Sequence, residues 1–215
     1  MIGKVKIRHL FLLAWLAALS TKAQVSSENY VQTTERISDT QVLSTTEYYD
    51  GLGRPFEMVE QKKTPDGANL IHLKEYDGLG RDWKTWLPVK DASDFLSISA
   101  ARSQGNNQYR DSHAFSLTEY DGSPLNRINT VEGVGAEWTS HPVKKDYLVN
   151  TSKYPLNCKY YRVSMQGQLQ DKGYYPEGRL YVTKTTDENG NESYEFKNIA
   201  GNVILKRTIC SIDEA

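Results

Sequence analysis

The six-residue string Tyr-Asp-Gly-Leu-Gly-Arg occurs twice in this chain of 215 residues, at 49–54 and again at 76–81. A catalytic loop is normally needed once, whereas a structural unit that cannot bury its apolar face alone has a reason to recur. The repeat therefore favours an architecture built from similar units over a single reactive site.

Each copy has the composition of a tight turn between two strands. An Asp in a turn can accept hydrogen bonds from the backbone two residues further on, and Gly adopts positive φ without steric cost. The same aromatic-Asp-Gly signal returns at 120–122. The residues predicted to build these turns are Asp50, Gly51, Gly53, Arg54, Asp77, Gly78, Gly80, Arg81, Asp121 and Gly122.

Segments rich in β-branched and aromatic residues separate the turns and predict strands at 41–49, 54–62, 68–76 and 81–89. Phe56 and Val59 are an odd number of residues apart, so either both faces of their strand are covered or a bulge intervenes. Fainter copies, with turns at Asn189-Gly190 and Gly201-Asn202, bring the expectation to at least eight strands.

Residues 88–118 interrupt this pattern. Phe95, Ile98 and Ala101 have helical spacing and follow polar residues able to cap a helix, which predicts one short helix near 92–103. Residues 104–108 have the composition of a loop. The predicted fold class is mainly β, an antiparallel β-hairpin sheet with this one helix in an insertion.

The N-terminus has the pattern of a secretory signal peptide. Three basic residues precede the apolar run at 10–19, and Ala23 offers a small residue for cleavage before Gln24. Ten apolar residues are about half of the ~20 that cross a bilayer, so no stable membrane anchor is expected. The domain prediction is a signal peptide at 1–23, a lead segment at 24–40 and a β-rich domain at 41–215, truncated at its C-terminus. We expect an exported protein of the periplasm, cell surface or medium.

Charge and cysteine content limit the classes of partner and site. Without residues 1–23 the chain has 22 Lys and Arg against 27 Asp and Glu, so no nucleic-acid partner is expected. In an exported chain a disulfide between Cys158 and Cys210 can persist, but two unpaired thiols fit the sequence equally well.

Aromatic-Asp-x-x-Gly-Arg followed by a short strand resembles the YD repeat of bacterial RHS proteins and teneurins. The order of the motifs from about residue 29 to 208 resembles the uncharacterised N-terminal region of RHS-type proteins secreted by Bacteroidota. The resemblance implies β-hairpin repeats that coil into a shell, with downstream RHS repeats or a C-terminal toxin as partners in full-length relatives. This chain stops at Ala215, without a long repeat array or a toxin.

The residue types of catalysis and metal binding occur without a supporting pattern. Asp50, Asp77 and Asp121 precede turn glycines and lack the alternating acidic spacing of a calcium loop. No His-Glu-x-x-His or Cys-x-x-Cys motif accompanies the histidines. Arg54 and Arg81 could bind an anion, but side chains that cover aromatics and bond a neighbouring Asp are favoured. We expect no catalytic residue, cofactor or metal.

These observations predict a non-enzymatic structural segment of an exported RHS/YD-repeat protein, part of a β-sheet shell or its N-terminal plug. The alternative is a carbohydrate- or surface-binding module, in which exposed aromatics such as Trp83 and Trp86 stack on a glycan.

Overall fold

The computed structural model describes residues 28–39 and 41–209, so the predicted signal peptide at 1–23 lies outside the described residues. The predicted mainly β fold is confirmed, since strands hold 48% of the residues and helices 9%. The strands are β1 (Asn29–Arg36), β2 (Val42–Tyr49), β3 (Pro55–Glu60), β4 (Asn69–Tyr76), β5 (Asp82–Trp86), β6 (Val89–Asp91), β7 (Phe115–Tyr120), β8 (Ile128–Glu132), β9 (Val143–Val149), β10 (Lys159–Val163), β11 (Leu169–Tyr174), β12 (Tyr181–Thr186), β13 (Glu192–Lys197) and β14 (Val203–Ile209); the helices are α2 (Ile98–Tyr109) and the 3-10 helix η2 (Ala136–Ser140).

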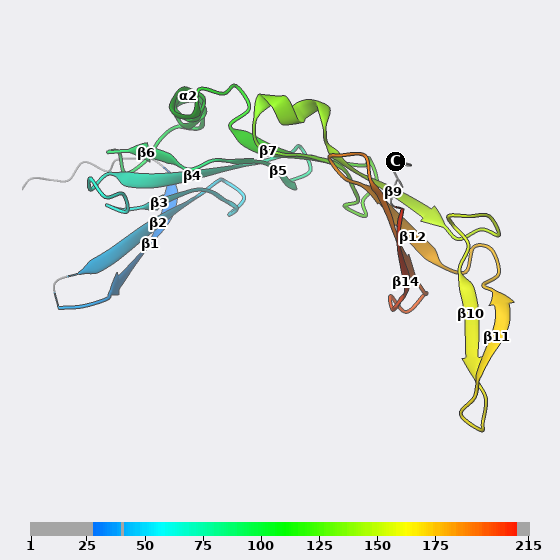
Figure 1. Cartoon of the computed structure of the whole chain (residues 1–215). Coiled ribbons are helices and arrows are strands. Elements are labelled where there is room, and N and C mark those ends of the chain that lie inside the picture. Colours follow the sequence, from blue (N-terminus) through cyan, green and yellow to red (C-terminus); the bar gives the residue numbers. More distant parts are fainter. Residues whose placement is uncertain (1–27, 40, 210–215) are drawn as a thin grey trace, which may run out of the picture.

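Within the described ranges, twelve strands form one sheet in the order β1-β2-β3-β4-β5-β7-β8-β9-β12-β13-β14, with β6 paired to β4. Every pairing is antiparallel, and β10 and β11 form a separate two-stranded sheet. Figure 1 shows that the large sheet is long and curved, with α2 and the light-green segment between β8 and β9, which contains η2, above it. Most neighbouring strands are also consecutive in sequence, so the sheet is a row of hairpins.

A β-bulge follows the turn in four of these hairpins and explains the imperfect alternation of apolar residues. Tyr48 pairs with Glu57 and Tyr49 with Pro55, which leaves Phe56 as an extra residue on β3. The bulge lets Phe56 join Val59 in the same buried cluster, although the two are an odd number of residues apart. The other extra residues are Trp83, Asn129 and Ile204.

One face of the large sheet is covered in two places. Near β2 to β7, α2 and the segment before it enclose a cluster around Val59, Ile71 and Trp86. Near β12 to β14, the segment before β10 covers a second cluster around Val182 and Phe196. Cross-strand partners share a face, and the register places the polar row Lys145, Thr185, Ser193 and Thr208 on the opposite face.

The helix in the insertion starts and ends later than the sequence predicts. Its N-cap is Ser97, whose side chain accepts from the Ala100 N–H, and it ends at Arg110 in a left-handed conformation with φ of 53°. The loop predicted at 104–108 is wrong, because these residues form the second half of α2. Gly105 is buried there, and a Cβ on it would lie 3.3 Å from the Trp86 ring, so close packing explains a residue that composition assigns to a loop.

Two further segments differ from the sequence prediction in detail. The lead segment at 24–40 contains β1, which pairs along its whole length with β2. The single strand predicted at 81–89 is divided at Leu87 and Pro88: β5 pairs with the second half of β4, and β6 pairs with the first half. Proline ends the ladder here because it has no N–H to donate.

Candidate functional site

The repeated turns are built around the side chain of their aspartate. In the first copy, one Asp50 oxygen accepts from the N–H groups of Leu52 and Arg54, both at 2.9 Å, and the other accepts from Arg54 Nε at 2.8 Å. Asp77 makes the same three bonds to Leu79 and Arg81 at 2.9, 2.9 and 2.7 Å. The Arg54 backbone N–H, followed by its guanidinium, lowers the pKa of Asp50.

Only the second glycine of each repeated turn has a left-handed conformation. Gly53 and Gly80 have φ of 77° and 81°, and each N–H donates to the carbonyl of the turn aspartate. This is the left-handed position of a type I turn followed by a glycine bulge. Gly51 and Gly78 do not have positive φ and have open space around them, so the second glycine of each copy sets the shape of the turn.

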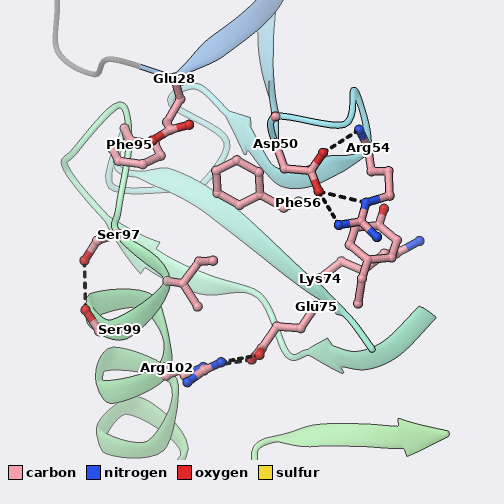
Figure 2. Close-up of a pocket in the computed structure, with 13 residues that line it drawn as sticks. Glu28, Asp50, Arg54, Phe56, Lys74, Glu75, Phe95, Ser97, Ser99 and Arg102 are labelled. Atoms are coloured by element: carbon pink, nitrogen blue, oxygen red, sulfur yellow. Dashed lines mark hydrogen bonds and ion pairs between the residues drawn. The ribbon is translucent and has the colours of Figure 1, made fainter. Parts of the chain in front are cut away.

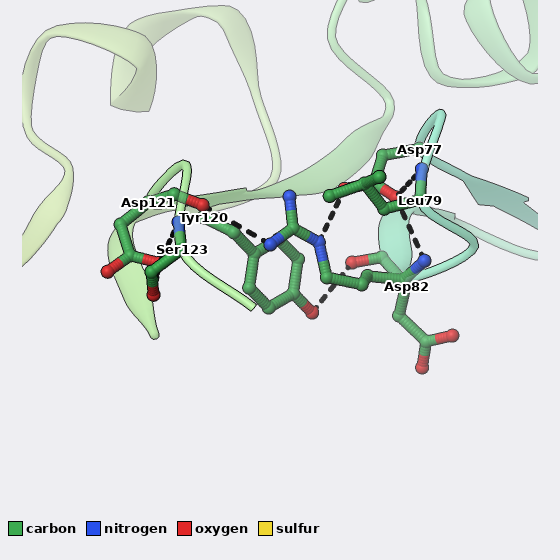
Figure 3. Close-up of polar contacts among 7 residues, drawn as sticks. Asp77, Leu79, Asp82, Tyr120, Asp121 and Ser123 are labelled. Carbon is green, nitrogen blue, oxygen red and sulfur yellow. Dashed lines mark hydrogen bonds and ion pairs between the residues drawn. The ribbon is translucent and has the colours of Figure 1, made fainter. Parts of the chain in front are cut away.

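Each arginine also reaches the tyrosine of the next hairpin, as the second copy shows in Figure 3. The Arg81 guanidinium bonds Asp77 and lies 4.4 Å above the centre of the Tyr120 ring. Arg81 Nη1 donates to the Asp121 carbonyl at 3.3 Å, and the Tyr120 hydroxyl donates to the Asp82 carbonyl at 3.0 Å. The side chain that completes one turn therefore also holds the strand that leads into the next.

The contact between an arginine and the tyrosine of the next hairpin also occurs before and after the Arg81–Tyr120 pair along the chain. Arg54 lies 4.5 Å above the Tyr76 ring, whose hydroxyl donates to the Pro55 carbonyl at 2.7 Å. Arg127 lies 5.0 Å above the Tyr147 ring, whose hydroxyl donates to the Ile128 carbonyl at 3.1 Å. We call these three arginine–tyrosine pairs the turn ladder. The third tyrosine could not be found from the motif, because no Asp follows Tyr147.

The later copies depart from the motif in different ways. Asp121 begins a longer turn, closed by its N–H donating to the Arg127 carbonyl, and its carboxylate accepts from Ser123 instead of an arginine. Gly122 does not have positive φ. Sequence reasoning missed Asp187, which accepts from the N–H groups of Asn189 and Asn191 as Asp50 does in its turn. The signal was available as Asp-x-x-Gly-Asn, with asparagine in place of arginine.

The turn ladder can be measured by a double-mutant cycle. Arg81→Ala should lower the free energy of unfolding by about 1–2 kcal/mol, because it removes the bond to Asp77 and the contact with Tyr120. The cycle with Tyr120→Ala should give a coupling energy of about 0.5–1.5 kcal/mol in urea unfolding. The exposed Arg179 supplies the control, and Arg179→Ala should have little effect. Strictly additive effects of the two substitutions would show that the ring contact contributes nothing.

A pocket of about 710 Å³ lies between the first repeat turn and the start of α2. Figure 2 shows Asp50 and Arg54 on one side, Ser97, Ser99 and Arg102 on the other, and the ring of Phe56 between them. Its cations are paired with carboxylates of the pocket or of neighbouring residues: Arg54 with Asp50, Arg102 with Glu75, and Lys74 with Asp82 at 3.2 Å. Glu75 also accepts from Trp86 Nε1 at 2.7 Å, so these groups stabilise the fold around the pocket.

The aromatic and metal-ligating side chains give no reactive cluster in the part of the chain that the structure describes. No group of three or more His, Cys, Asp or Glu residues there could hold a metal ion. Trp86 is only 7% exposed and packs on Phe115, so it is a core residue and cannot stack on a glycan at the surface. Trp83 is half-buried, with Lys84 Nζ 4.3 Å from its ring centre.

Cys158 is buried in the second cluster and has no disulfide partner among the described residues; burial raises the pKa of its thiol. Cys210 lies outside the described residues, so its pairing with Cys158 stays a prediction. Among the described helices none is long and apolar enough to cross a membrane.

Comparison with known proteins identifies the chain by family. No curated protein and no solved structure matches it. Residues 20–149 match the family described as Domain of unknown function (DUF6443), a range that ends with β9 and includes all three pairs of the turn ladder. The chain belongs to the DUF6443 family.

Proposed function

We propose that this chain is a non-enzymatic structural segment of an exported RHS/YD-repeat protein, where it forms part of a β-sheet shell or its N-terminal plug. The observation that carries the proposal is the turn ladder. Three times in succession an arginine contacts the tyrosine of the next hairpin, and the first two of these arginines are held by the aspartate of their own turn. Contacts between neighbouring units are how repeat proteins gain stability.

The two ends of the large sheet also support a role in a wall. Among the strands at 28–39 and 41–209, β1 pairs only with β2, and β14 only with β13. All eight residues of β1 are exposed, and the strand contains no proline. Long edges of this kind present unpaired backbone groups that another strand can satisfy. In the proposed shell these edges meet further repeats of the same protein.

The carbohydrate-binding alternative has weaker support. It relied on exposed aromatics, and Trp86 is buried. Several other aromatic side chains are exposed, among them Tyr30, Trp138, Tyr154 and Tyr181, but they lie on four different segments: β1, η2, the loop after β9, and β12. The pocket beside the first turn contains ion pairs that already satisfy its arginines. We therefore favour the structural function.

The state of association in solution tests the wall proposal. The exported form, residues 24–215, should self-associate through its edges, so its mass by light scattering should rise with concentration. The double variant Val31→Lys and Ile204→Lys should stay monomeric, because a lysine on each edge opposes strand addition. Leu52→Lys is the control, since Leu52 is 78% exposed at a turn tip instead of an edge.

A monomer at every concentration, with cooperative unfolding, would contradict the open-wall arrangement. Loss of association in the Leu52→Lys control would also contradict it, because the contact would then lie at the turn tips.

A further inference from the structure

The hairpin β10–β11 stands apart from the large sheet. Of the strands that the structure describes, its two strands pair only with each other, and Figure 1 shows the hairpin extending away from the sheet beyond β12 and β14. A two-stranded hairpin without a third strand or a covering helix is marginally stable in water. Neither the turn ladder nor the edges of the large sheet involve it. We call residues 159–174 the arm.

The outer half of the arm exposes apolar side chains. Val163 and Leu169 face each other across the two strands and are 69% and 70% exposed. Met165 lies in the turn between them and is fully exposed. Tyr161, two residues before Val163 on β10, is half exposed. Exposed apolar side chains that gather at one place mark a surface for a protein or a membrane partner.

Charge is distributed along the long axis of the arm. Residues 163–170, which form the tip, include no charged side chain. The stem below it carries Lys159, Arg162 and Lys172 against the single acidic residue Asp171. The stem is therefore positive by two charges on a chain whose formal net charge is −1.

We propose that the tip of the arm inserts into the surface of an anionic lipid bilayer. An uncharged tip with three exposed apolar side chains, Val163, Met165 and Leu169, enters the boundary between head groups and acyl chains, while the cations behind it remain at the level of the head groups. Tyr161 and Tyr174 are both about half exposed at the stem, in the position where amphipathic rings prefer the membrane interface. The cations complement the charge of anionic head groups.

The arrangement fits a lipid surface better than a groove on a protein. A groove would enclose an apolar stripe along one side of the arm. Tyr161, Val163 and Leu169 do share one face, but Met165 lies in the turn beyond the end of both strands, and the cations lie in the stem. The change from apolar to charged therefore runs with distance from the tip, as the polarity of a bilayer interface does. The proposed contact is peripheral, so it agrees with the expectation that the chain has no stable membrane anchor.

Vesicle flotation with the exported form, residues 24–215, tests this proposal. This form retains every described residue and lacks the apolar run at 10–19, which would bind lipid itself. The protein should float with phosphatidylglycerol vesicles and not with phosphatidylcholine vesicles. Met165→Asp should lower the apparent affinity at least about tenfold, because it places a charge where an apolar side chain is buried. Lys172→Glu should lower it by a similar factor, about tenfold, and reduce the dependence on salt.

Leu79→Asp is the matched control, because Leu79 is 71% exposed at a turn tip of the large sheet. It should float like the unaltered protein, and circular dichroism should show all variants folded. Absence of flotation with either vesicle, or an equal loss in the Leu79→Asp control, would overturn the proposal. Self-association through the arm would overturn it too, since the arm would then bind protein. In that case the mass in lipid-free solution would rise with concentration in the Val31→Lys and Ile204→Lys variant but not in Met165→Asp.

Discussion

Replacement of Asn150 by alanine should lower the free energy of unfolding by about 3 kcal/mol, because buried polar groups would lose their partners. Asn150 is fully buried at the end of β9. Its side-chain oxygen accepts from the Leu180 N–H at 2.8 Å, and its nitrogen donates to the carbonyls of Tyr175 and Pro176 at 3.4 and 3.0 Å. This one side chain thus fixes the return of the chain from the arm to β12.

Thermal and urea unfolding followed by circular dichroism would measure the loss, which corresponds to a fall in Tm of roughly 6–12 °C for a chain of this size. Asn150→Asp keeps the shape but loses the donor, and it should also be strongly destabilised. The control is Asn191→Ala, which removes one exposed bond to Asp187 at 2.9 Å and should cost less than about 1 kcal/mol. Equal effects at positions 150 and 191 would contradict the role assigned to Asn150.

Glu57 should make the protein less stable as the pH rises from about 4.5 to about 7. Its side chain is 1% exposed; one oxygen accepts from the Leu96 N–H at 3.0 Å, and the other has no hydrogen-bond partner among the described residues. Burial raises the pKa of Glu57 from 4.5 to about 7, because the charged form is poorly solvated there. The folded protein therefore binds the proton more tightly than the unfolded chain does.

The sign of the effect follows from this difference in pKa. The stability that proton binding to Glu57 contributes is fully present below the pKa of this group in the unfolded chain, 4.5. It is lost as the pH rises through the pKa in the folded protein, about 7, and the total loss is about 3 kcal/mol. Urea unfolding below about pH 5 and above about pH 7.5 brackets this window. Glu57→Gln should remove the dependence, and Glu35→Gln on the exposed strand β1 should retain it. A Glu57→Gln protein that still loses stability across the window would show that another group is responsible.

The turns could be predicted from sequence because their structure is local. The bonds of Asp50 and Asp77 reach no further than four residues, and the left-handed glycine is part of the same short string. Asp187 was missed because the pattern was read with arginine in its last position. The hydrogen bonds that shape the turn require only a side-chain oxygen in the first position, from Asp or from Asn as at Asn198, and the glycine.

The contacts between hairpins could not be predicted, because they depend on register and on bulges. Tyr120 reaches Arg81 across 39 residues of sequence, and no local rule indicates that they meet. Trp86 was interpreted as an exposed aromatic, but α2 covers it and a buried glutamate accepts its N–H. The second half of α2 was interpreted as a loop, since the packing of Gly105 on that ring is a tertiary effect.

The turn ladder has a consequence for how such a chain can change during evolution. Between Arg54 and Tyr76 the chain forms one simple hairpin, whereas between Arg81 and Tyr120 it also forms β6 and α2. The geometry of the pair is nearly the same in both cases, with 4.5 and 4.4 Å between guanidinium and ring centre. The contact depends on which strands are neighbours and is insensitive to the length of chain between them. A gene encoding this fold can therefore acquire new segments between hairpins without disturbing the sheet, and those segments become available for new functions on the face that α2 covers.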